Sequence, residues 1–165
     1  MAYQRLQVSN AIDVIPSDTV PIPDPSSFVL RGVGDFSVAG IVTNPTTTFT
    51  TDGIQKNAII YNYTANEAYI VTDVVNDTKI ALSPSSAGGA ADTFLIFNAP
   101  ALAATLYVGG NGNISVEMAS NRDAAINTGL NPTVFAGITA GTFMPTLVTK
   151  VLSSGTTATP IKALF

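Results

Sequence analysis

Alternation of apolar and polar residues is the clearest pattern in the last third of the chain. Between 113 and 118 the apolar residues Ile114, Val116 and Met118 alternate with polar ones. A period of two is typical of a strand with one buried face. Together with the apolar runs at 105–108, 143–152 and 156–164, this pattern predicts four or five short strands between 104 and 164.

Glycines mark the reversals that we expect between these strands. Gly and Asn tolerate positive φ, so the segment 109–112 predicts a tight turn that closes a hairpin with 113–118. A second hairpin is predicted from 143–152 and 156–164, around a turn at 153–155. The glycines assigned to structural turns are Gly109, Gly110, Gly112, Gly141 and Gly155.

A second group of short apolar runs lies between residues 28 and 98. The segment 28–41 predicts a strand, a bend and another strand. Further strands are predicted at 57–63, 68–75, 79–82 and 93–97. Five or six strands at this spacing indicate a small barrel or sandwich. No helical period persists in the chain, and the best helix candidate is the short segment 118–127.

Four prolines lie in an otherwise polar stretch between residues 16 and 25. Proline fixes φ and removes the amide donor, so this stretch is expected to be extended and outside any sheet interior. It is either a flexible linker or an arm laid along a neighbouring subunit. For the arm, the predicted assembly contacts are Pro16, Asp18, Pro21, Pro23 and Pro25.

The two groups of strands predict a domain organisation with an insertion. Residues 1–25 and 100–165 form one β unit with an extended Pro-rich N-terminal arm, and residues 26–99 form a second unit inserted into it. Prolines stand at both seams, at 25 and 100. A host fold tolerates an insertion whose ends lie close together, because the cost of loop closure grows slowly with length. We therefore expect an all-β fold with two small barrel-like or sandwich-like units.

The composition points to assembly. Only 11% of the 165 residues are charged and 46% are hydrophobic, against about 25% charged residues in ordinary soluble domains. A surface poor in charge suits subunit contacts, so we expect an oligomer or a subunit docked on a larger assembly. The net charge of −4 and the seven scattered basic residues argue against nucleic-acid binding.

Reactive side chains are scarce. The chain has no cysteine and no histidine, which removes thiolate chemistry, the usual general base and the commonest metal ligand. We therefore expect no enzyme activity and no cofactor. Carboxylates that proximity could pair are expected to cap turns instead. They are Asp73 with Asp77, Asp13 with Asp18, and Glu117 with Asp123.

Two weaker binding alternatives remain. The loops 44–53 and 73–78 could supply oxygen ligands to Ca²⁺ if folding brought them together, although no metal site is predicted. Four tyrosines could form a sugar-binding face, but packing between strands is the preferred interpretation. These are Tyr61, Tyr63, Tyr69 and Tyr107.

Four phrases of the sequence are specific when they are taken together: IPSDTVPIP at 15–23, LYVGGNGNI at 106–114, AGTFMP at 140–145 and SGTTATPIKAL at 154–164. Together they resemble the spike-base family, whose members sit at the base of head spikes on tailed phages and gene-transfer agents. In that family the first phrase runs almost directly into the second. Here residues 26–99 stand between them.

The middle of the chain carries its own phrases: DFSVAGI at 35–41, IIYN at 59–62, VTDV at 71–74 and DTKIALS at 77–83. These resemble a small β module that is common in virion proteins of tailed phages. The usual Gly-Asp before the Ile-Ile-Tyr run is replaced by KNA at 56–58, which changes one turn of the pattern.

The resemblances imply a structural virion protein, such as a capsid decoration, cement or head-spike base subunit. It would lie on the capsid exterior after synthesis in the cytoplasm of a bacterial host. The implied partners are the major capsid protein, further copies in a homotrimer or homopentamer, and a fibre or spike protein. Neither nucleic acid nor membrane is an expected partner. The alternatives are a receptor-binding or glycan-binding module of a fibre or tail, and a neck or tail component.

Overall fold

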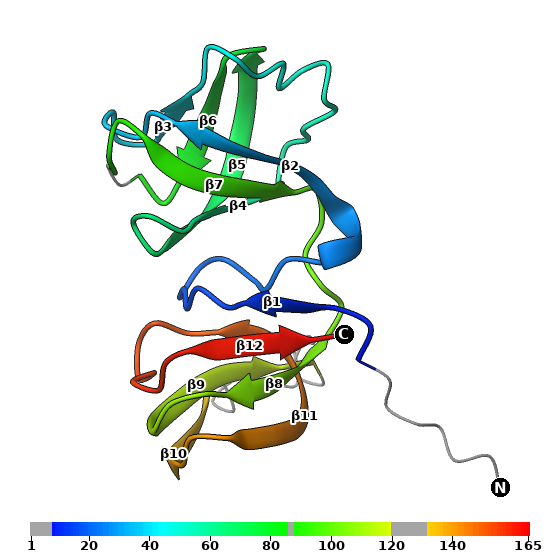
Figure 1. Cartoon of the computed structure of the whole chain (residues 1–165), viewed down its shortest axis with the longest axis vertical. Helices are drawn as coiled ribbons and strands as arrows, with labels where there is room; N and C mark the ends of the chain where they lie inside the picture. Colours follow the sequence, from blue (N-terminus) through cyan, green and yellow to red (C-terminus); the bar gives the residue numbers. More distant parts are fainter. Residues whose placement is uncertain (1–7, 86–87, 120–131) are drawn as a thin grey trace, which may run out of the picture.

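The computed structural model describes residues 8–85, 88–119 and 132–165, which form two antiparallel sheets of six strands each (Figure 1). The described residues contain no α-helix; a 3-10 turn spans Pro25–Ser27 (η1). The prediction of an all-β fold with two small units is therefore confirmed. The predicted helix at 118–127 lies outside the described residues, except for its first two positions; Met118 belongs to a strand.

The first sheet, which we call the host unit, takes its strands from both ends of the chain. Their order across the sheet is β1–β12–β8–β11–β9–β10, so β1 and β10 are its edges. The strands are β1 (Ala11–Asp13), β8 (Ala104–Val108), β9 (Gly112–Met118), β10 (Thr133–Ile138), β11 (Thr142–Val151) and β12 (Ile161–Leu164).

The second sheet, which we call the inserted unit, lies between β1 and β8 in the sequence, in the order β2–β7–β4–β5–β6–β3. Its strands are β2 (Phe28–Gly34), β3 (Ile41–Thr43), β4 (Ile59–Asn62), β5 (Glu67–Asn76), β6 (Lys79–Ser83) and β7 (Asp92–Phe97). Asp35 and Thr43 exchange backbone hydrogen bonds of 2.8 and 3.0 Å. The sheet therefore curls until its two edges meet at one end.

The two connections between the units run side by side. The Asp24 amide donates to the Ala99 carbonyl (2.9 Å) and the Asn98 amide to the Ser27 carbonyl (2.9 Å). An isolated bridge pairs Pro23 with Pro100. The ends of the inserted unit are thus adjacent, which is the condition under which a host fold accepts an insertion at small entropic cost.

The strands of the last third pair differently from the prediction. Strand β11 lies between β8 and β9, and β8 lies between β11 and β12, so both predicted hairpins are wrong. The physical reason lies in β11. Its pairing with β8 shifts register between Met144 and Val148, and its distal half pairs with β9 through Val148 and Val151. One long strand therefore separates two strands that are consecutive in the sequence.

The glycines at 109–112 accordingly do not form a hairpin turn. They allow the backbone to pass close to the backbone of residues 158 and 159. A Cβ on Gly110 would lie 1.9 Å from the carbonyl oxygen of Thr159, so only glycine fits. Gly112 has a φ of +148° and lies against Ala158. Gly141 and Gly155 do occupy turns, with φ of +88° and +89°.

The Pro-rich stretch belongs to neither sheet, as predicted, but it bends at Asp18 and Thr19 and lies on its own chain between the two units (Figure 1). The amides of Val14, Ser17 and Ile22 donate to carbonyls of the host unit at 2.8–2.9 Å. Val14 and Ile22 are buried in the host core. On the opposite side, Ile15 and Val20 pack against the inserted unit. We call residues 14–22 the joining segment.

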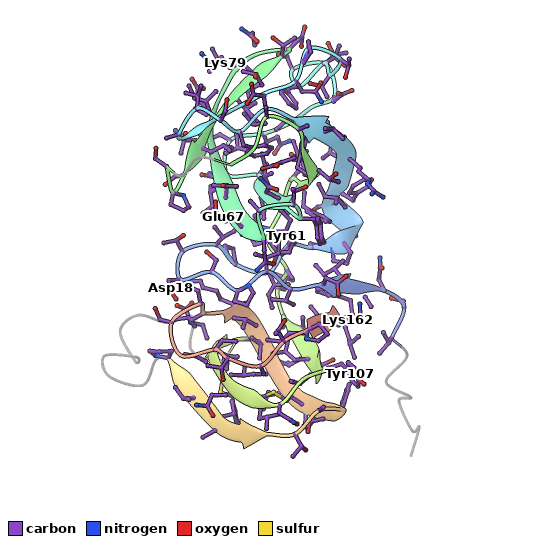
Figure 2. All side chains as sticks on the ribbon, turned by 60° about the vertical axis from the view of Figure 1, so that its left-hand side comes forward. Asp18, Tyr61, Glu67, Lys79, Tyr107 and Lys162 are labelled. Carbon is purple, nitrogen blue, oxygen red and sulfur yellow. The ribbon has the colours of Figure 1, made fainter. Side chains whose placement is uncertain are left out.

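The joining segment explains why β4 is buried on both faces. Ile60 points into the core of the inserted unit, which contains Phe36, Phe94 and Tyr69. Ile59 and Tyr61 point the other way, toward Ile15 and Val20. Figure 2 shows Tyr61 at the boundary between the units. The two units therefore share an apolar contact that is built from the joining segment.

Candidate contact surface

Large apolar side chains are exposed on the outer side of the host sheet. In β8, Leu106 and Val108 are buried in the host core, whereas Tyr107 points outward and is 39% exposed. The strand register pairs Tyr107 with Phe143 of β11, which is 41% exposed. The alternation that builds the core thus leaves two aromatic rings on neighbouring strands facing solvent.

The same cross-strand row continues toward the sheet edge and ends in an ion pair. Tyr107 is paired with Lys162 of β12, and Lys162 with Asp13 of β1. The Lys162 Nζ lies 2.6 Å from the Asp13 Oδ1, and both side chains are about half exposed. Such a pair contributes little to stability. Figure 2 shows Lys162 and Tyr107 on the same side of the host unit.

A second row of residues lies beside the first, and within it Leu147 is exposed whereas Thr105 is buried. Leu147 of β11 is 55% exposed, and Thr105 of β8 is paired with Leu164 of β12. Leu147, Thr105 and Leu164 line one shallow groove. We call the whole surface the outer face. It consists of Thr105, Tyr107, Phe143, Leu147 and Leu164.

Sequence reasoning missed Phe143 and Leu147 as surface residues. In TFMPTLVTKV the buried positions are Met144, Val148, Thr149 and Val151. Because Phe143 and Leu147 alternate with Met144 and Val148, large apolar residues occur at both odd and even positions of the strand. A strand with apolar residues in both phases has two covered faces or one exposed apolar face. That signal was available in the sequence, but it could not distinguish the two cases.

The predicted assembly contacts of the Pro-rich stretch have neighbours within the chain. Pro23 is buried, and Pro16, Pro21 and Pro25 are half-buried. Asp18 is exposed, and its carboxylate accepts hydrogen bonds from the Ser154 amide (2.9 Å) and hydroxyl (2.6 Å). These hydrogen bonds hold the pKa of Asp18 below its ordinary value. Asp18 therefore caps the turn that contains Gly155.

Four of the six carboxylates that proximity suggested as acid–base pairs have separate partners, and Asp73 lies in β5. Asp13 pairs with Lys162, and Glu117 with Lys150 at 2.9 Å. Asp18 caps Ser154, and Asp77 accepts from the amides of Thr50 and Thr51 at 3.1 and 3.4 Å. Asp123 lies outside the described residues. These contacts give the carboxylates structural roles in turns and between strands.

The two loops considered for calcium do come together. The amides of Phe49 and Asn44 donate to the carbonyls of Asp77 and Thr78, at 2.8 and 2.9 Å. The Asp77 carboxylate, however, already accepts backbone amides of the facing loop. Within residues 8–85, 88–119 and 132–165, no cluster of three Asp or Glu residues is placed to hold a metal ion.

The four-tyrosine sugar face is wrong. Tyr61 and Tyr69 are buried, Tyr63 is half-buried, and only Tyr107 is exposed. Tyr61 makes an edge contact with Phe97 and hydrogen-bonds to the backbone of Ile15, and burial raises its pKa. Tyr61 is covered by the joining segment, and Tyr69 lies in the core of the inserted unit.

A buried polar pair was also missed by sequence reasoning. The Asn62 side chain donates to the Asp92 carboxylate (2.8 Å), which also accepts from the Gly89 amide (2.8 Å). Both side chains are buried. This network links β4 and β7 to the loop that contains Gly89, so its role is structural.

Comparison of the chain with protein-family models, with curated proteins and with solved structures finds no significant match. Within the part of the chain that is described, no helix has the length and apolar character needed to cross a membrane.

Proposed function

We propose that the chain is a structural protein of a tailed-phage particle that docks on the shell and on copies of itself. The observation that carries this proposal is the outer face. Tyr107, Phe143 and Leu147 are between 39% and 55% exposed on adjacent strands whose other side forms the host core. A contiguous exposed apolar patch on a small protein usually marks a binding surface.

The low charge of the chain supports the same proposal. The charged fraction is 11%. The five residues of the outer face are uncharged, and the exposed Lys162–Asp13 ion pair lies at its edge. The cores of protein interfaces are depleted in charge and enriched in aromatic residues. A surface of this kind favours contact with another protein over contact with a polyanion.

Within this proposal, the four phrases of the host unit favour a capsid decoration, cement or head-spike base subunit on the capsid exterior. The partners are then the major capsid protein and further copies in a closed ring, a homotrimer or homopentamer. A fibre or spike protein is a further partner. The inserted unit extends from the opposite side of the joining segment (Figure 1), where it is available to such a protein.

The proposed docking contacts lie on the outer face rather than on the apolar side chains of the Pro-rich stretch. Ile15, Val20 and Ile22 are all at most 3% exposed, so a neighbouring subunit has no access to them. In this mechanism the joining segment holds the two units in a fixed relation, and the outer face makes the contacts between subunits.

The experiment is to mix the purified chain with shells of the particle that lack it, and to image the result by electron cryomicroscopy. We expect density for the chain that repeats with the symmetry of the shell. The double variant Tyr107→Ser, Phe143→Ser should lose this density, while Val38→Ser, at a more exposed site of the inserted unit, should keep it. A wild-type chain that does not bind the shells would contradict the proposal.

A second candidate, a glycan-binding module of a fibre or tail, is favoured by one observation. The two exposed rings of Tyr107 and Phe143 adjoin a half-exposed ion pair between Lys162 and Asp13. Rings that stack on a sugar next to groups that bind its hydroxyls could hold a saccharide. Reproducible binding on a glycan array, lost in Tyr107→Ser and without affinity for shells, would favour this candidate. Density on the neck or tail would instead indicate a neck or tail component.

A further inference from the structure

We propose that the open edge of β2 binds an extended acidic segment of another protein, which adds to the inserted sheet as a further strand. Within the proposed function this partner is the fibre or spike protein, so the identity of the partner rests on that function. Three features support the binding itself: backbone groups of β2 that face no other strand, the charge of Arg31, and an apolar cleft beside it.

Strand β2 is an edge of the inserted sheet, with β7 on its one paired side. On the other side, an isolated bridge joins Asp35 to Thr43 through two backbone hydrogen bonds. The chain then turns away, because the Asn44 amide donates to a carbonyl of the turn between β5 and β6 (2.9 Å). Pro45, the next residue that could face Val33, has no amide to donate. The two edges of the sheet therefore separate beyond the bridge.

The backbone groups of Arg31 and Val33 point to this open side. In a strand, the amide and carbonyl groups of successive residues alternate between its two sides. Asp35 directs both groups across the seam, whereas Phe36 exchanges hydrogen bonds with the loop before β7 (2.8 Å each). Val33 and Arg31 precede Asp35 by two and four residues, so their groups point the same way as those of Asp35.

Thr93 shows the same orientation independently. It lies opposite Val33 in the register of β2 and β7. Its amide nevertheless donates to the Thr64 hydroxyl (2.9 Å), and its carbonyl accepts from the Tyr63 amide (2.9 Å). Val33 therefore has no backbone partner in β7. Among the described residues, none bonds to the outward amides and carbonyls of Arg31 and Val33. Such an edge is a template for an added strand.

The side chain of Arg31 determines the chemistry of the occupant. Arg31 is exposed and belongs to neither of the ion pairs found between described residues. A carboxylate directly opposite it on an added strand would be favourable. The β2 edge of a second copy would instead bring a second Arg31 close to the first, and like charges oppose such pairing. The edge therefore suits an acidic segment of a different protein.

An apolar cleft adjoins Arg31 on the same face of the sheet. Leu95 is the cross-strand partner of Arg31, and Phe97 is the partner of Phe28. The Phe28 ring is 47% exposed and makes an edge contact with Phe97, with 5.7 Å between ring centroids. The cleft has a volume of about 310 Å³ and is lined by Asn10, Ile12, Pro25, Phe28, Leu95 and Phe97. A partner segment with an apolar side chain two residues from its carboxylate would contact this cleft.

Hydrogen exchange followed by NMR tests the open edge in the full chain without any ligand. The amides of Arg31 and Val33 should exchange at least about 100-fold faster than those of Gly32 and Gly34, which face β7. Equal protection of all four amides would overturn the inference, because the edge would then already be occupied.

Binding is measured by fluorescence anisotropy with the labelled peptide Thr-Val-Thr-Glu-Thr-Leu-Thr, which places Val, Glu and Leu on one face of a strand. We expect saturable binding to the full chain. The same peptide, methylated on the backbone nitrogens of Val, Glu and Leu, cannot donate to β2 and should not bind. Binding of both peptides, or of neither at up to about 1 mM, would overturn the inference.

Two variants test the two contributions of β2. Val33→Pro removes an outward amide without removing a ladder hydrogen bond, which an edge strand tolerates, and it should abolish peptide binding. Arg31→Glu should weaken binding at least about tenfold, and a peptide with Lys in place of Glu should restore it for this variant only. Val38→Ala, at a 58% exposed site of the same unit, should bind like wild-type. Circular dichroism checks folding, and unchanged affinity of folded Arg31→Glu would overturn the inference.

Shell binding and sedimentation, assayed in parallel, separate this inference from the proposed function. A chain that binds the peptide but not the shells contradicts only the proposed function. A chain that binds shells but neither the peptide nor the fibre or spike protein contradicts only the inference. Self-association that is lost in Val33→Pro would show that a second copy occupies the edge, and this too would overturn the inference.

Discussion

At the scale of single residues, the fold of the host unit depends on a few close contacts between distant segments of the chain. Gly110 lies directly under the Thr159 carbonyl, and Asp18 fixes the turn around Gly155 through Ser154. Both contacts join segments that are far apart in the sequence. The sequence marks these residues as turn formers, but it does not reveal which distant segment each one meets.

Gly110→Ala should destabilise the chain by about 2–4 kcal/mol, because a Cβ would lie 1.9 Å from a backbone oxygen. The matched control is Gly53→Ala, which also replaces a loop glycine. Gly53 has a φ of +75° and open space around its Cβ position, so its cost should be about 1 kcal/mol. Urea unfolding of both variants measures the difference. Equal destabilisation would show that the crossing relaxes easily.

Asp18 predicts a pH dependence of stability. Hydrogen bonds from Ser154 hold its folded-state pKa below the ordinary value of 3.8. A depressed pKa stabilises the fold above the unfolded-state pKa, and this contribution is lost as the pH falls through the folded-state pKa. Asp18→Asn should therefore melt at a lower temperature than wild-type at pH 7, and the difference should shrink below about pH 3. Because Asp18 is exposed, we expect a small shift. A difference that is constant with pH would contradict the assignment.

At the scale of elements, the strands could be predicted from the sequence but their pairing could not. Alternation is a local property, and it located β4, β5, β6 and β7 to within about three residues. Strand pairing depends on contacts between segments that are far apart in the sequence. The two hairpins of the last third were predicted from turn residues alone, and neither forms. Strand β11 lies between β8 and β9 in the sheet, and nothing in the local sequence indicates this order. Tyr61 is a second example: residues 14–22 cover its side chain, and no local pattern indicates this contact.

The joining segment predicts coupling between the two units. Ile15→Ala should cost about 2–5 kcal/mol, since Ile15 is 3% exposed and packs against Ile59 and Tyr61. Because this contact bridges the units, we also expect faster proteolysis at the seam around 98–100. Limited proteolysis with mass spectrometry detects the cut.

The control for the joining segment is Val75→Ala, at a site that is half-exposed on the inserted unit. It should leave both stability and the cleavage rate close to wild-type values. Removal of residues 1–25 should unfold the host unit, because it deletes β1 and the core residues Val14 and Ile22. This differs from both sequence-based hypotheses for the stretch, a flexible linker and an arm laid along a neighbouring subunit. A truncated chain with native stability would contradict the role of the segment.

At the scale of the whole molecule, composition and architecture agree. The sequence indicates an assembling subunit because only 11% of its residues are charged. The structure locates three of the exposed large apolar side chains, Tyr107, Phe143 and Leu147, on one face of the host sheet, whereas others such as Phe28 and Val33 lie on the inserted unit. The sequence could not locate that face, since outward and inward positions of β11 are equally apolar. Only the register of β8, β11 and β12 separates them.

An apolar contact predicts how association responds to salt. Exposed ion pairs weaken as screening increases, whereas burial of apolar surface does not. The ion pair between Lys162 and Asp13 lies at the end of the aromatic row and is half exposed. Self-association should therefore change by less than about threefold between about 0.05 and 0.5 M NaCl, and sodium sulfate should strengthen it. Lys162→Ala should also leave it nearly unchanged, whereas the double variant Tyr107→Ser, Phe143→Ser should weaken it at the same concentrations. Sedimentation at several salt concentrations measures this response, and a steep loss with NaCl would assign the contact to the ion pair instead of the apolar side chains of the outer face.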